Sequence, residues 1–140
     1  MKKIFIILWL AVLGGSLTAQ TNQPLEVVVN KVKSEEGTLM VALFNSEKTF
    51  TAQPWKGEKS KAQSGTMKIV FHDIPSGQYV VAVYHDANEN GKMDSNFMGI
   101  PKEGFGFSND AMGTFGPPSY EKALIHWTGA ETFTINLKYY

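Results

Sequence analysis

The amino-acid sequence predicts an all-β protein, an antiparallel Greek-key β-sandwich of six to seven strands with one long ordered loop. Apolar residues recur at every second position in several segments, which is the pattern of half-buried strands. Short turn-forming segments rich in glycine, proline and serine separate them, and almost no helical spacing is present. Six or seven strands in one chain of this length are typical of two packed sheets.

The first 19 residues have the features of an export signal, so we expect a single β-sandwich domain at residues 20–140. Lys2 and Lys3 precede an apolar run at 4–13, and a cleavage site of small residues ends at Ala19. No later segment is long and apolar enough to span a bilayer. The sequence contains no cysteine, which excludes a disulfide framework and a lipid-modified cysteine. The expected location is periplasmic or extracellular.

Six segments have the composition or alternation of strands. The final one alternates most clearly, with Phe133, Ile135 and Leu137 on one face. The others are rich in β-branched and aromatic residues. In chain order the predicted strands are 25–33, 38–45, 66–71, 78–85, 121–127 and 132–139, with a short additional strand near 59–63.

Three short connections carry turn chemistry, and we expect each to close a hairpin. They are Ser34-Glu35-Glu36-Gly37, Ile74-Pro75-Ser76-Gly77 and Thr128-Gly129-Ala130. The connection 86–120 differs, because it exceeds thirty residues and shows no clear secondary structure. Loops of that length are usually functional or disordered, and its many aromatic residues argue against disorder.

The segment 86–94 predicts what holds this loop in place. Oxygen-bearing side chains stand at its positions 1, 3, 5 and 9, and glycine stands at position 6, which is the spacing of a calcium-binding loop of the EF-hand type. Phe97 occupies position 12 in place of the usual glutamate, so Glu103 is expected to supply the missing oxygen, with Asn96 as the second candidate. The predicted calcium ligands are Asp86, Asn88, Asn90, the Lys92 carbonyl, Asp94 and Glu103.

The loop follows a predicted strand rather than a helix and holds few carboxylates, so we expect a calcium affinity of roughly 10⁻⁵ to 10⁻³ M. The alternative is a plain hairpin turn, because Asn90-Gly91 favours a type I′ turn. A turn alone, however, does not require oxygens at four alternating positions.

Other chemistry has weaker support in the sequence. His72, His85 and His126 lack the spacing of a metal site, and Ser108 does not stand in a nucleophile elbow. Every basic residue is lysine, none of these lysines form a cluster, and removing two signal lysines from a neutral chain leaves a charge of −2. Nucleic-acid binding is therefore not expected.

Two joined motifs resemble a family of exported bacterial single-domain β proteins of unknown function. They are Asp-x-Asn-x-Asn-Gly-x-x-Asp at 86–94 and Gly-Phe-Ser-Asn at 106–109. The resemblance implies a single exported β-domain and brings no activity with it. The turn at 74–79 is also similar to that of transthyretin-like and collagen-adhesin-repeat β-sandwiches, a likeness that concerns architecture only.

The sequence therefore favours a non-enzymatic, calcium-stabilised module that binds a protein or a glycan through the loop after Asp86. Two alternatives stay open. One is a secreted hydrolase that uses His85 and loop carboxylates. The other is a carrier of a small apolar ligand held between the sheets.

Overall fold

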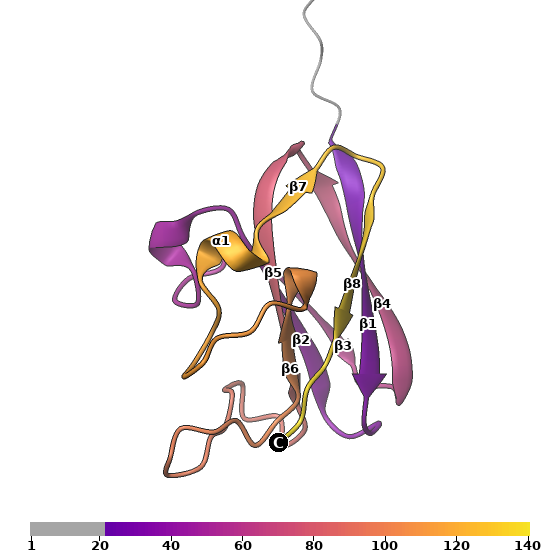
Figure 1. Ribbon diagram of the computed structural model, residues 1–140. Helices are drawn as coiled ribbons and strands as arrows, with labels where there is room; N and C mark the ends of the chain where they lie inside the picture. The colour runs from indigo at the N-terminus through magenta and orange to yellow at the C-terminus, as the bar shows by residue number, and fades with distance from the viewer. Residues whose placement is uncertain (1–21) are drawn as a thin grey trace, which may run out of the picture.

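The computed structural model describes residues 22–140, which form two packed β-sheets (Figure 1). The predicted all-β sandwich is confirmed, and the predicted export signal lies outside the described residues. The first sheet has the order β4-β1-β8, and the second has the order β3-β2-β5-β6 with β7 also paired to β5. Within the described part of the chain, eight strands form where six or seven were predicted.

The strand bounds agree well with the sequence pattern in the first half of the domain. They are β1 (Gln23–Val32), β2 (Thr38–Phe44), β3 (Lys56–Lys61), β4 (Gly65–Ile74) and β5 (Gly77–Asp86). The later elements are β6 (Phe105–Phe107), α1 (Tyr120–Ala123), β7 (Ile125–Trp127) and β8 (Thr132–Asn136), with short 3₁₀ turns at η1 (Glu47–Thr49) and η2 (Ser108–Asp110).

The three connections predicted as hairpins are not hairpins. Residues 34–37 lead from β1 to β2, residues 74–77 from β4 to β5, and residues 128–130 from β7 to β8, and each passes from one sheet to the other. Alternation fixes which face of a strand is buried, but it does not say which neighbour the strand joins. The sandwich is also not wholly antiparallel, because β8 runs parallel to β1.

The second half of the chain contains further corrections. The predicted strand 121–127 begins as α1, whose N-cap Ser119 accepts a hydrogen bond from the Lys122 N–H, and only its end is strand β7. The predicted strand 132–139 ends at Asn136. The long connection 86–120 is divided by β6, which pairs with β5.

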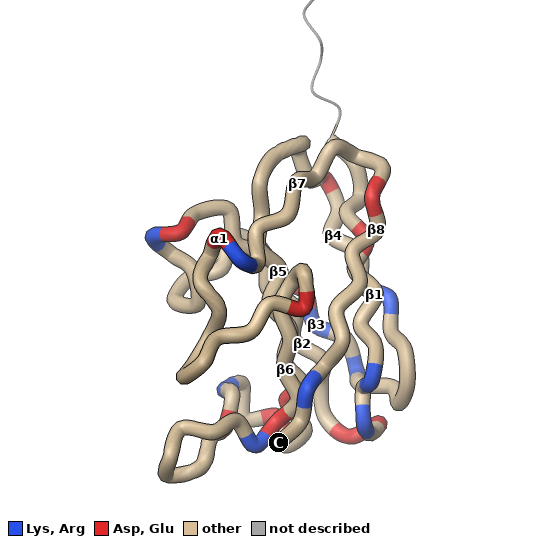
Figure 2. Tube along the Cα trace, viewed as in Figure 1, with Lys and Arg blue, Asp and Glu red and all other residues tan. Residues whose placement is uncertain are grey.

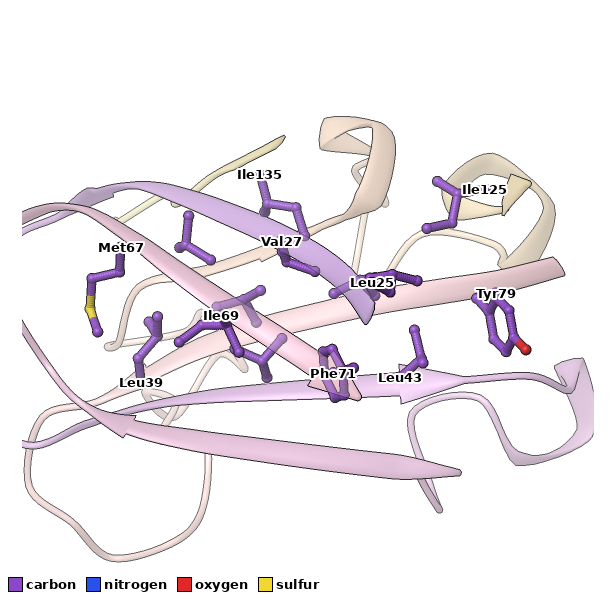
Figure 3. Close-up of a cluster of buried hydrophobic side chains, with 14 of the residues drawn as sticks. Leu25, Val27, Leu39, Leu43, Met67, Ile69, Phe71, Tyr79, Ile125 and Ile135 are labelled. Atoms are coloured by element: carbon purple, nitrogen blue, oxygen red, sulfur yellow. The ribbon is translucent and has the colours of Figure 1, made fainter. Parts of the chain in front are cut away.

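The core fills the space between the sheets (Figure 3). Side chains from facing strands, such as Leu25, Val27 and Phe71 from the first sheet and Leu39 and Leu43 from the second, are fully buried there. A second cluster contains Phe44 and Val80 together with Phe105, Phe107 and Ala123. The aromatic residues of β6 therefore pack onto the domain. Among residues 22–140, no helix has the length and apolar character needed to cross a membrane.

Candidate metal site

The end of β5 and the start of β6 bring together the two most buried carboxylates of the predicted calcium site. β5 ends at Asp86, and the returning strand β6 is its antiparallel neighbour, with the His85 N–H donating to the Gly104 carbonyl at 2.7 Å. Asp86 and Glu103 are consequently both buried at the base of the loop 87–104. The pairing of these strands explains why a residue seventeen positions after Asp86 belongs to the same site.

Both carboxylates organise the backbone of the loop. Asp86 accepts the Asn90 N–H at 3.1 Å on Oδ1 and the Gly91 N–H at 2.8 Å on Oδ2. Gly91 adopts a positive φ of 73°, which glycine tolerates without strain. Glu103 accepts the Ala87 N–H at 3.1 Å on Oε1 and the Asp94 N–H at 3.0 Å on Oε2. Each carboxylate thus joins separate parts of the loop.

Three of the predicted ligands converge above this base. The Nδ2 groups of Asn88 and Asn90 donate to Asp94 Oδ2 at 2.6 and 2.8 Å. These hydrogen bonds, from Asn88 first and Asn90 second, lower the pKa of the Asp94 carboxyl, with smaller contributions from the positive charges of Lys102 and Lys92. Asp94 is therefore held as a carboxylate at neutral pH.

A hollow of about 450 Å³ opens beside these side chains. Four of the six predicted ligands line the hollow, namely Asn88, Asn90, Asp94 and Glu103, whereas Lys92 and the buried Asp86 do not. The complete lining is Ala87, Asn88, Asn90, Asp94, Ser95, Lys102 and Glu103. The second candidate for the missing oxygen, Asn96, instead accepts the N–H groups of Met98 and Ile100.

The side chains at this site carry the oxygen groups that calcium binds, but the amides of Asn88 and Asn90 are not oriented to bind it. Within residues 22–140, no group of three or more His, Cys, Asp or Glu side chains is placed to hold a metal on its own. A cation would therefore need amide and backbone oxygens as well as carboxylates. The Asn88 and Asn90 amides present nitrogen to Asp94, and their oxygens accept the N–H groups of Asn90 and Lys92. For their oxygens to face a cation beside Asp94, both amides would have to turn, which would break the two backbone hydrogen bonds that they now accept.

Several residues of the site were not identified from the sequence. Lys102 lines the hollow and its N–H donates to the Asp94 carbonyl at 2.8 Å, and Ser95 lines it beside Asp94. Thr38, at the start of β2, donates its hydroxyl to Glu89 Oε1 at 3.2 Å. Lys102 could have been predicted as part of the site because it precedes Glu103 in the sequence. The Thr38 contact could not, because it depends on the pairing of β2 with β5.

His85 does not take part in the hollow. Its side chain is buried, with Nε2 donating to the Glu36 carbonyl at 2.7 Å and Nδ1 accepting from the Tyr139 hydroxyl at 3.1 Å. The same hydroxyl accepts the Lys33 N–H at 3.1 Å. Both ring nitrogens are therefore engaged in joining three segments of the fold.

The Gly-Phe-Ser-Asn motif also has a structural role. Ser108 is buried, accepts the Val81 N–H at 3.0 Å and donates to the Ala123 carbonyl, so its hydroxyl joins β5 to α1. Asn109, which follows it with a φ of 61°, donates to the carbonyls of Lys122 and Leu124. Ser108 is thus a buried anchor rather than an exposed nucleophile.

Comparison with known proteins gives one finding. A family model described as "Uncharacterized protein conserved in bacteria (DUF2141)" matches residues 27–135, which span the strands from within β1 to within β8. No curated protein and no solved structure matches the chain.

Proposed function

We propose that this chain, which belongs to the DUF2141 family of uncharacterized proteins conserved in bacteria, is an exported binding module rather than an enzyme. Calcium stabilises the module, and the loop after Asp86 binds a protein, a glycan or another macromolecular surface. The β-sandwich supplies the rigid support from which such a loop acts.

The observation that carries this proposal is the convergence of Asn88, Asn90 and Asp94 above the buried carboxylates of Asp86 and Glu103. A loop needs no such concentration of oxygen groups merely to reverse direction. Asp86 and Glu103 each accept two backbone hydrogen bonds, and a carboxylate has lone pairs for about four, so both retain capacity for a cation.

In this proposal Asp86, Asn88, Asn90, Asp94 and Glu103 supply side-chain oxygens to the ion, and Asp86 also positions the turn. The Lys92 carbonyl completes the set as the spacing of the loop predicts. Calcium supplies a divalent charge that links these oxygens. The chain contributes the arrangement: β5 and β6 fix the two ends of the loop, and the Gly91 turn brings its two arms together.

The contacts of His85 and Ser108 support binding over hydrolysis. A hydrolase would need a nucleophile or an acid–base pair within reach of a substrate. Both residues are buried and fully engaged with the fold, and neither lines the hollow beside Asp94. The packed side chains of Leu25 and Phe71 between the sheets likewise favour a binding module over a carrier.

The test is a thermal melt of residues 20–140 in calcium and in excess chelator. If calcium at 100 times its dissociation constant binds only the folded state, it adds about 2.7 kcal/mol of stability, which raises the midpoint by several degrees. Asp94→Asn should remove this rise. Asp73→Asn, the same change at an exposed aspartate at the end of β4, should leave it intact. Superimposable melts of the unaltered protein would refute the calcium site.

A further inference from the structure

We propose that the outer end of this loop, residues 95–101, docks onto a phospholipid surface. We call this segment the apolar tip. The inference deepens the proposed function, because it names the partner of the loop after Asp86, and it rests on that loop being the binding face.

The apolar tip presents large hydrophobic side chains to water. Phe97 is 97 % exposed and Met98 is 65 % exposed, and Ile100 and the neighbouring Met93 are also exposed. Figure 2 shows the acidic and basic residues near the base of the loop, where it leaves the sandwich, and none at its outer end. The segment 95–101, which contains no charged residue, therefore forms the outer end of the loop.

Several backbone N–H groups of the apolar tip form hydrogen bonds within the tip itself. The Asn96 N–H donates to the Ile100 carbonyl at 2.8 Å, and the Gly99 N–H donates to the Asn96 carbonyl at 2.9 Å. The N–H groups of Met98 and Ile100 both donate to the Asn96 side-chain oxygen, at 2.9 and 3.0 Å. Unpaired backbone N–H groups are the main cost of placing a loop in lipid. These internal bonds reduce that cost.

The size of the apolar tip favours lipid over a protein partner. A stable protein–protein interface buries about 800 Å² on each side. The three exposed apolar side chains of this short turn, Phe97, Met98 and Ile100, provide much less than this by themselves. Shallow insertion between headgroups requires only an apolar group of this size together with favourable charge at the surface.

Charge links the lipid surface to the calcium site. Between residues 86 and 104 the chain has four acidic residues and two lysines, so the loop carries a formal charge of −2, which one calcium ion cancels. An anionic surface repels the loop without calcium and no longer does so once the ion is bound. Lys92 and Lys102 are then available to approach lipid phosphates.

The experiment measures co-sedimentation of residues 20–140 with vesicles of phosphatidylcholine and phosphatidylglycerol in equal parts. This chain contains every strand of both sheets and lacks the apolar run at 4–13, which could itself bind lipid. We expect binding in calcium and its loss in chelator, whereas vesicles of phosphatidylcholine alone bind weakly in either condition. Phe97→Ser should weaken binding about tenfold, since it removes one apolar side chain from the lipid phase.

The matched control is Phe115→Ser, the same change at a fully exposed phenylalanine on a different loop. It should leave vesicle binding unchanged, and melting curves should show that both variants stay folded. Equal losses from the two variants would overturn the assignment to the apolar tip. Absence of vesicle binding, with the calcium-induced rise in melting temperature intact, would overturn the lipid partner and leave the proposed calcium site standing. Vesicle binding that depends on Phe97 without any calcium effect on melting would support the inference and refute the calcium site.

Discussion

The ionised form of Asp94 is favoured by its hydrogen-bond partners in the loop. The amides of Asn88 and Asn90, followed by the charges of Lys102 and Lys92, lower the pKa of its carboxyl below the ordinary value of 3.8. A carboxyl of this kind stabilises the folded loop at pH values above 3.8, and the contribution is lost as the pH falls through the lowered value. We therefore expect the loop to keep its shape down to about pH 4 and to loosen below it.

An NMR titration of the side-chain carboxyl, with chelator present, measures this directly. Asn88→Ala should move the Asp94 midpoint back toward 3.8, because it removes the strongest hydrogen bond to the carboxylate. Asn136→Ala alters an asparagine that pairs with a different carboxylate, Asp110, and should leave the midpoint unchanged. A midpoint at or above 3.8 in the unaltered protein would contradict the arrangement.

The spacing of the loop predicted which side chains lie near one another, but not how they interact. Asn88, Asn90 and Asp94 do converge, and Glu103 accepts the Asp94 N–H, whereas Lys92 does not line the hollow that they share. The sequence could not show that Asp86 and Glu103 would accept backbone N–H groups, because those bonds depend on the paired ends of β5 and β6. It also could not fix which end of each asparagine amide faces Asp94.

At the scale of the elements, the hydroxyl of Ser108 holds β5 and α1 together. Ser108→Ala leaves the buried Val81 N–H and Ala123 carbonyl without this partner, so the free energy of unfolding should fall by about 1–3 kcal/mol. Denaturant unfolding measures the change. Ser46→Ala is the control, since the Ser46 side chain makes no cap hydrogen bond to η1 and its loss should cost less than about 0.5 kcal/mol. Equal free energies of unfolding for the Ser108→Ala and Ser46→Ala variants would refute the proposed role of Ser108 in holding β5 and α1 together.

Strand positions could be predicted from the sequence because a period of two is a local property. Strand partners could not, since the short connections at 34–37 and 74–77 look like hairpin turns but pass between sheets. β6 was missed because three residues in a glycine-rich segment give no readable period. The first turn of 121–127 became helix through a local cap at Ser119, which outweighed the strand propensity of the segment.

For the whole molecule, stability depends on the core between the sheets. Phe71 is fully buried there, so Phe71→Ala should lower the free energy of unfolding by about 3–5 kcal/mol. Phe115→Ala, at a fully exposed phenylalanine, should change it by less than about 0.5 kcal/mol. The rise in melting temperature on adding calcium should persist in both variants, because the core contains none of the proposed ligands. Denaturant unfolding and melting curves together test these outcomes.

The parallel pairing of β1 with β8 places the first strand of the domain beside the last, with Val27 opposite Phe133. The first sheet is therefore complete only when β8 is present beside β1. Pairings between strands so far apart along the chain are slow to form, so we expect the closing of this sheet to be a late step in the folding of the domain.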